Sequence, residues 1–249
     1  MWKAPGPVAI DWPRLARVMT TAFLGCLAAT LAALLGGPLR RWLASGGHRR
    51  PTDEPRPLPR FGGVQVALGV GAGVPAGVLG ESARTAGEHP LHLTVSALLA
   101  GTLLALAVTA CAVDLDVHRL PNDLTRPMAL VAAGGTALLT LPSGDLAGLG
   151  RALVAGTGLA AAYLLLSVLT RGGIGLGDVK LALPVGTVLG LLGWAPVLLG
   201  TWIAFGLGAL AATVLMLRRR ATRSTHLAFG PAMTAGAWLV WVLWLPGSA

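Results

Sequence analysis

The residues best suited to chemistry in this sequence are carboxylates at the ends of long apolar runs. The stretch Gly175-Leu176-Gly177-Asp178-Val179-Lys180 precedes the longest such run, and Asp114-Leu115-Asp116 follows an earlier one. Two carboxylates held a few ångströms apart cannot easily both ionise, so they share one proton. The ionised member can take a proton from water while the protonated member donates to a peptide carbonyl. We therefore predict that Asp114 and Asp178 form a pair that activates water.

The elements that must position this pair are membrane helices. The chain is 54% hydrophobic and only 12% charged, with a mean hydropathy of +0.72, whereas a soluble domain carries about 25% charged residues. A helix needs roughly 20 apolar residues to cross a bilayer. The charge-free runs of about this length or more are Val18–Leu39, Phe61–Gly80, Leu91–Val113, Pro127–Gly144, Ala152–Thr170, Leu181–Leu217 and Leu227–Ala249.

The run that starts at Leu181 is long enough for two helices, and Gly193 and Pro196 provide the break between them. The predicted fold is all-α, a polytopic membrane helix bundle with about eight transmembrane helices. Residues 1–90 are expected to hold an N-terminal leader, two membrane helices and a short basic cytoplasmic loop, and residues 91–249 a catalytic membrane domain.

The order of the runs places the two acids on one side of the membrane. Between Asp114 and Asp178 the chain crosses twice, through Pro127–Gly144 and Ala152–Thr170. Most of the 19 lysines and arginines fall in the loops on the same side. The positive-inside rule assigns that side to the cytoplasm and both termini to the opposite side. The net charge of +9 then reflects topology, and we expect no nucleic-acid partner.

Each of these residues also has a simpler structural role open to it. An aspartate at a helix start, such as Asp178, is commonly an N-cap, and a lone Gly-x-Gly-Asp pattern is weak. Asp116 can be a solvated loop charge, and Pro121-Asn122 can be a turn. Lys180 can reach out to the membrane interface, or it can tune Asp178.

Two further acids could line the same end of the bundle, namely Asp123 and, as a weaker candidate from the polar loop of residues 40–60, either Asp53 or Glu54. That loop is rich in Arg, Pro and Gly and poor in apolar residues, so we predict a mobile cytoplasmic linker. The alternative is contact between its arginines and anionic lipid headgroups.

The combination of motifs resembles the type IV prepilin peptidase family of Gly-x-Gly-Asp membrane aspartyl proteases. Asp114 ends an apolar helix and is followed seven positions later by Pro121 and then Asn122. The second motif of the family, Gly-x-Gly-Asp-x-Lys, appears as the stretch from Gly175 through Gly177 and Asp178 to Lys180. A third, Phe-Gly-Pro at the start of the last helix, is matched by Phe229-Gly230-Pro231. The resemblance covers roughly residues 95 to 245.

This resemblance implies that Asp114 and Asp178 are catalytic and that Asp116 and the other motif residues support them. It implies an aspartic endopeptidase that cleaves the basic leader from prepilin or pseudopilin-like precursors at the cytoplasmic face of the inner membrane. Many members carry paired Cys-x-x-Cys motifs in a zinc-bearing domain. Cys26 and Cys111 form no such motif, so we expect peptidase activity without that domain, a metal or an organic cofactor. N-methylation and the oligomeric state stay open.

Two other classes of membrane protein fit part of the pattern. A transporter or proton-relay protein would also place carboxylates and glycine-broken helices inside a bilayer. A catalytically silent assembly subunit of a secretion system is the other. The spaced Pro121-Asn122 and the Phe229-Gly230-Pro231 element have no use in a proton relay, which favours the peptidase.

Overall fold

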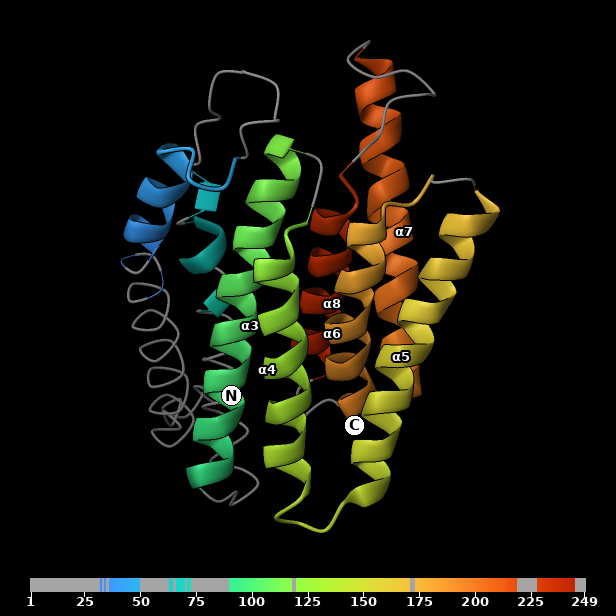
Figure 1. Ribbon diagram of the computed structural model, residues 1–249. Coiled ribbons are helices and arrows are strands. Elements are labelled where there is room, and N and C mark those ends of the chain that lie inside the picture. The colour runs from blue at the N-terminus through green and yellow to red at the C-terminus, as the bar shows by residue number, and fades with distance from the viewer. Residues whose placement is uncertain are drawn as a thin grey trace, which may run out of the picture.

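The computed structural model describes residues 32, 34, 36–49, 63–64, 66–69, 71–72, 90–117, 120–170, 173–218 and 228–244. These residues form helices and connecting turns, with no strand among them, so the predicted all-helical bundle is confirmed (Figure 1). The longer helices are α3 (Pro90–Val117), α4 (Asn122–Thr140), α5 (Leu146–Leu169), α6 (Leu176–Leu192), α7 (Trp194–Leu217) and α8 (Gly230–Leu243). Residues 36–44 are also helical. The predicted first two membrane helices lie largely outside the described residues.

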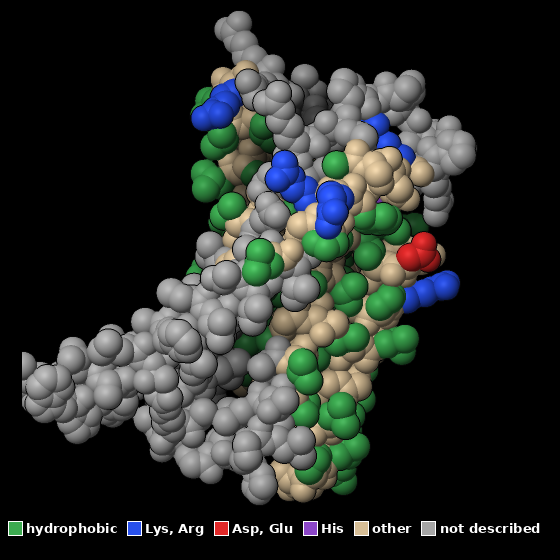
Figure 2. Space-filling model, turned by 90° about the vertical axis from the view of Figure 1, so that its left-hand side faces the viewer, with side chains coloured by type: hydrophobic (Ala, Val, Ile, Leu, Met, Phe, Trp, Pro, Cys, Tyr) green, Lys and Arg blue, Asp and Glu red, His purple; other side chains and the backbone are tan. Residues whose placement is uncertain are grey.

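Three helices in the described part of the chain are long and apolar enough to cross a membrane. They are Leu98–Val117, Leu146–Leu169 and Trp194–Leu217, and α8 is a shorter apolar helix. Large hydrophobic side chains such as Leu130 and Trp202 stand exposed on the surface of the bundle. Figure 2 shows hydrophobic side chains along the described part of one face, with Lys and Arg from its upper end down to about mid-height. This surface suits a lipid environment, because a soluble bundle would cover it with polar groups.

The helix boundaries differ from the charge-free runs where polar residues join a helix. α4 begins at Asn122, five residues before the run that starts at Pro127, so Pro127 lies inside the helix. The break predicted near Gly193 is confirmed, since Gly193 separates α6 from α7 with a φ of +140°. Pro196 instead lies in the first turn of α7, where the missing N–H costs no intrahelical hydrogen bond.

Helices α5 and α6 approach each other closely because small residues line their contact. A Cβ added at Gly186 of α6 would lie 2.7 Å from the carbonyl oxygen of Ala155 in α5. One added at Gly190 would lie 2.9 Å from Cα of Ala152. Small residues let backbones meet in this way and gain dispersion contacts that larger side chains would prevent. The position of α6, which carries Asp178, is therefore set against α5.

The C-terminal end of α6 is held by an arginine of α5. Arg151 Nε donates to the carbonyl of Gly190 at 2.9 Å, and its Nη2 donates to the carbonyl of Leu191 at 3.1 Å. The last carbonyls of a helix have no intrahelical partner and carry the negative end of its dipole, so a guanidinium stabilises them.

The helices alternate in direction, which brings the sequence motifs to one end of the bundle (Figure 1). The C-terminal end of α3 lies at this end, as do the N-terminal ends of α4, α6 and α8, and we call it the motif end. Asp114 lies in the last turn of α3, and Asp178 in the first turn of α6. The inference that both acids share one side of the bundle is thus in accord with the fold.

Candidate active site

Asp114 and Asp178 are both buried at the motif end, with exposed fractions of 5% and 7%. The two carboxylates lie close enough for Asp114 to act electrostatically on Asp178. Burying two ionised acids near each other costs free energy, and the cost falls when the pair holds one proton between them. The two buried acids, on helices joined by a hairpin of two others, make this end of the bundle a candidate paired-carboxylate site.

The start of α6 presents Asp178 to the interior. Gly175 is the N-cap, with an extended backbone (φ −68°, ψ 144°), and its carbonyl accepts the N–H of Asp178 at 3.0 Å. The carboxylate of Asp178 forms a hydrogen bond with the backbone of Gly175. An acid at the third helical position that reaches back to the N-cap is half of a capping box. The structural role of Asp178 as a helix-start residue and its place in the pair are therefore compatible.

Gly177 lets the first turn of α6 sit against the end of the preceding motif. A Cβ at this position would lie 3.0 Å from Cβ of Leu120 and 3.3 Å from its backbone N. Leu120 is buried in the main hydrophobic core. It immediately precedes Pro121, the N-cap of α4. The second glycine of the motif thus serves a close backbone approach rather than a left-handed turn.

A hydrogen bond joins the first and second motifs. Lys180 Nζ donates to Oδ1 of Asn122 at 2.8 Å, across 58 positions of sequence. Both side chains are exposed, so this contact fixes relative position more than it stabilises the fold. It connects the first turns of α4 and α6.

The Phe-Gly-Pro element supplies the wall beside Asp114. A Cβ at Gly230, the first residue of α8, would lie 2.9 Å from Oδ2 of Asp114. Phe229 packs near Tyr163 and Phe205, with ring centroids 6.1 and 5.2 Å apart. Pro231 occupies the first turn, where proline is well tolerated. The third motif therefore contacts the first directly.

Residues 97–216 match the type IV leader peptidase family. This part of the chain belongs to that family. Over 144 residues the chain is 31% identical to a prepilin leader peptidase/N-methyltransferase from Neisseria gonorrhoeae, covering 55% of this chain and 46% of the relative. The chain thus spans about half the length of this curated relative. No solved structure matches.

The leader peptidase region contains α4, α5, α6, most of α3 and nearly all of α7. At the motif end, residues from outside this region lie beside both acids of α3. Gly230 lies beyond residue 216, and a Cβ added there would lie 2.9 Å from Oδ2 of Asp114. His48 and Arg49 lie before residue 97 and bind Asp116. The family match therefore does not contain every residue at the motif end.

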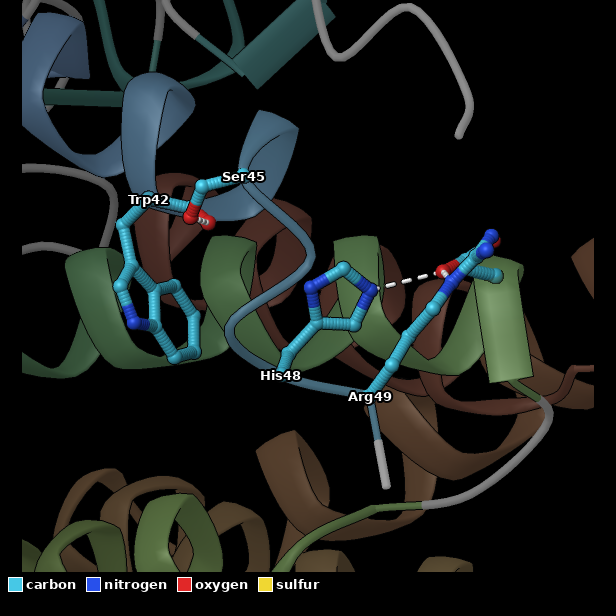
Figure 3. Close-up of polar contacts among 5 residues, drawn as sticks. Trp42, Ser45, His48 and Arg49 are labelled. Carbon is cyan, nitrogen blue, oxygen red and sulfur yellow. Dashed lines mark hydrogen bonds and ion pairs between the residues drawn. The ribbon is translucent and has the colours of Figure 1, made fainter. Parts of the chain in front are cut away.

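Asp116 takes a different position from Asp114, and its interpretation as a solvated loop charge is wrong. It belongs to α3, and its side chain is 4% exposed. His48 Nε2 lies 2.7 Å from Oδ2, Arg49 Nε donates to Oδ2 at 2.8 Å, and Arg49 Nη2 donates to Oδ1 at 2.7 Å. Figure 3 shows both side chains turned toward this carboxylate. We call this arrangement the His–Arg clamp.

The clamp corrects the prediction that the polar loop starts at Arg40 as a mobile linker. The helix there continues to Ala44, and residues 45–49 form a turn that packs onto α3. Sequence reasoning missed His48 and Arg49 as residues of the site. The available signal was the last turn of α3, which has two acids and no basic residue.

The remaining candidates are placed as follows. Asp123 is exposed in the first turn of α4. Asp53 and Glu54 lie outside the described residues. A cavity of about 280 Å³ opens between α4 and α6, lined by Asn122, Thr125, Arg126, Ala129, Lys180 and Leu183. Two of its lining residues are cationic, so the cavity disfavours a basic peptide.

Proposed function

We propose that this protein is a membrane aspartyl endopeptidase that cleaves the basic leader from prepilin or pseudopilin-like precursors. The observation that carries the proposal is the burial of Asp114 and Asp178 at the motif end, close enough for Asp114 to act electrostatically on Asp178. Membership of residues 97–216 in the type IV leader peptidase family supports peptide cleavage over proton transport. The relative from Neisseria gonorrhoeae supports a prepilin-type substrate.

The placement of the two acids on their helices suggests distinct roles. Asp178 lies at the N-terminal end of α6, where the helix dipole favours negative charge, and Asp114 lies at the C-terminal end of α3, where it does not. The shared proton then resides on Asp114. Asp178 takes a proton from water as the water oxygen bonds to the peptide carbon, and Asp114 donates its proton to the carbonyl oxygen. When the C–N bond breaks, Asp178 gives its proton to the leaving amine and one hydroxyl of the gem-diol returns a proton to Asp114, which leaves a carboxylic acid and restores the pair.

The distribution of charge supports a cytoplasmic location for this end of the bundle. On the face in Figure 2, most of the described lysines and arginines lie toward the upper end, which is the level of the motif end. Positive charge of this kind marks the cytoplasmic side of a membrane protein. The cavity lined by Arg126 and Lys180 repels the basic leader, so the leader approaches Asp178 from another side. The chemistry uses water and two carboxylates, and we propose no metal or organic cofactor.

Purified protein in proteoliposomes, given a precursor with a basic leader and a following apolar helix, tests the proposal. We expect a shortened product by mass spectrometry, and a rate loss of about 10²- to 10⁴-fold in Asp114→Ala and in Asp178→Ala. The matched control is Asp123→Ala, which removes an exposed acid at the same end. Normal processing by either Asp114→Ala or Asp178→Ala would show that the pair is wrongly assigned. A proton flux without product would favour the transporter.

A further inference from the structure

The turn that carries the clamp residues is built around glycine. Helical residues end at Ala44, and Gly46 takes a φ of +75°, which glycine adopts without strain. The N–H of Gly46 donates to the carbonyl of Leu43 at 3.1 Å, and its carbonyl accepts the N–H of Arg49 at 2.9 Å. This is a helix end closed by a left-handed glycine. The closed turn directs His48 and Arg49 toward α3 (Figure 3).

Positive charge reaches the last turn of α3 from another segment of the chain. That turn contains Asp114 and Asp116 and no basic residue. Carboxylates there face the negative end of the helix dipole. Arg49, 67 positions away in sequence, binds both oxygens of Asp116. His48 is itself buried, at 0% side-chain exposure, and shares Oδ2 with Arg49. A two-point arginine contact fixes direction as well as distance.

The clamp and the catalytic acid lie on different sides of α3. Residues two positions apart on a helix are separated by about 200° around its axis. Asp116 therefore faces the first segment of the chain while Asp114 faces Gly230 and Asp178. Cys111, one turn before Asp114, shares its face, and its Sγ lies 3.0 Å from Oγ1 of Thr234 in α8. A contact that holds Asp116 on one side of α3 therefore also fixes the direction in which Asp114 and Cys111 point on the other side.

We infer that His48, Arg49 and Asp116 are positioning residues, and that the His–Arg clamp sets the rotation of α3 so that Asp114 meets Asp178. The inference rests on the proposed peptidase function. It assigns a role to a segment that lies outside the residues matching the leader peptidase family. A helix as uniformly apolar as α3 has little in its own pattern to fix its rotation. The clamp supplies that constraint at the helix end that carries the acid.

The kinetic test compares Asp116→Asn, Arg49→Ala and Arg49→Lys with the wild-type protein in proteoliposomes. Asp116→Asn and Arg49→Ala should lower kcat by about ten- to a hundredfold with KM unchanged, because misplacement of about 1 Å costs about 10²-fold. Arg49→Lys keeps the charge but not the two-point contact, so its kcat should fall between Arg49→Ala and the wild type. Rates are expressed per folded molecule from size-exclusion chromatography. The matched control is Arg41→Ala, an exposed arginine of the same segment.

A second readout follows the rotation of α3 without using activity. In a Cys26→Ser background, the rate at which N-ethylmaleimide labels Cys111 reports whether its face still packs against Thr234. Labelling should accelerate severalfold in Asp116→Asn and Arg49→Ala and stay unchanged in Arg41→Ala.

The two readouts separate the possible failures. Wild-type kcat per folded molecule in Asp116→Asn and Arg49→Ala, or a change in KM alone, would overturn the positioning role. An unchanged rate of Cys111 labelling in the same variants would show that the clamp does not set the rotation of α3. A wild-type protein that cleaves no precursor would overturn the proposed function itself, and the labelling would still decide whether the clamp fixes α3.

Discussion

Gly230→Ala places a single methyl group against the carboxylate of Asp114. The added Cβ would lie 2.9 Å from Oδ2, and ordinary contact begins at 3.4 Å, so the carboxylate must move by about 0.5 Å. Asp114 is buried and cannot swing into solvent. Since a 1 Å misplacement of a reacting group costs about 10²-fold, we expect a rate loss of about tenfold. That loss corresponds to about 1.4 kcal/mol of transition-state stabilisation.

The assay is the initial rate of leader cleavage in proteoliposomes, with the thermal unfolding midpoint measured on the same samples. The midpoint is needed because alanine before Pro231 also disfavours helical backbone. The control is Gly158→Ala in α5, where an added Cβ meets nothing within 4 Å. If Gly230→Ala cleaved at the wild-type rate, or lost activity only in proportion to lost folded protein, the position of Asp114 beside Gly230 would have no bearing on the chemistry.

Two further predictions concern contacts that hold the motif end and α6 in place. Asn122→Ala and Lys180→Ala each remove the same hydrogen bond, so the double variant should cleave at about the rate of the slower single variant. If the losses in free energy of activation add instead, the two residues act separately. Gly186→Ala forces a methyl group against the backbone of α5, and overpacking of this kind costs about 1–3 kcal/mol of folding free energy. Its unfolding midpoint should fall, and turnover per folded molecule should fall with it because α6 carries Asp178, whereas Gly134→Ala, which meets nothing within 4 Å, should change neither.

The shared side of Asp114 and Asp178 could be predicted because it depends only on the number of crossings between them. Helix boundaries do not affect that count. The start of α4 could not be predicted from charge. Dividing the sequence into charge-free runs ends this run at Arg126, whereas the helix begins at Asn122. Polar residues at a membrane surface can continue a helix whose apolar part has ended. Gly193 was predictable as a break because an apolar run too long for one span must turn somewhere, and glycine permits the turn.

The His–Arg clamp could not be predicted, because it joins a turn to a helix end across 67 and 68 positions. The arginine-rich composition around Arg49 is equally consistent with a solvated linker or a lipid contact. The sequence of α3 is apolar on all sides and does not say which face meets which neighbour. Asp116 carried a hint, as one of two acids in the last turn of α3, a turn that contains no basic residue.

The contact between Arg151 and the end of α6 changes how the charge at the far end of the bundle is counted. Arg151 is one of few basic residues expected away from the motif end, and it donates to the carbonyls of Gly190 and Leu191. Its charge is therefore matched locally by a helix terminus instead of standing free near phospholipid phosphates. The difference in unmatched positive charge between the two ends of the bundle is therefore larger than a count of arginines and lysines suggests.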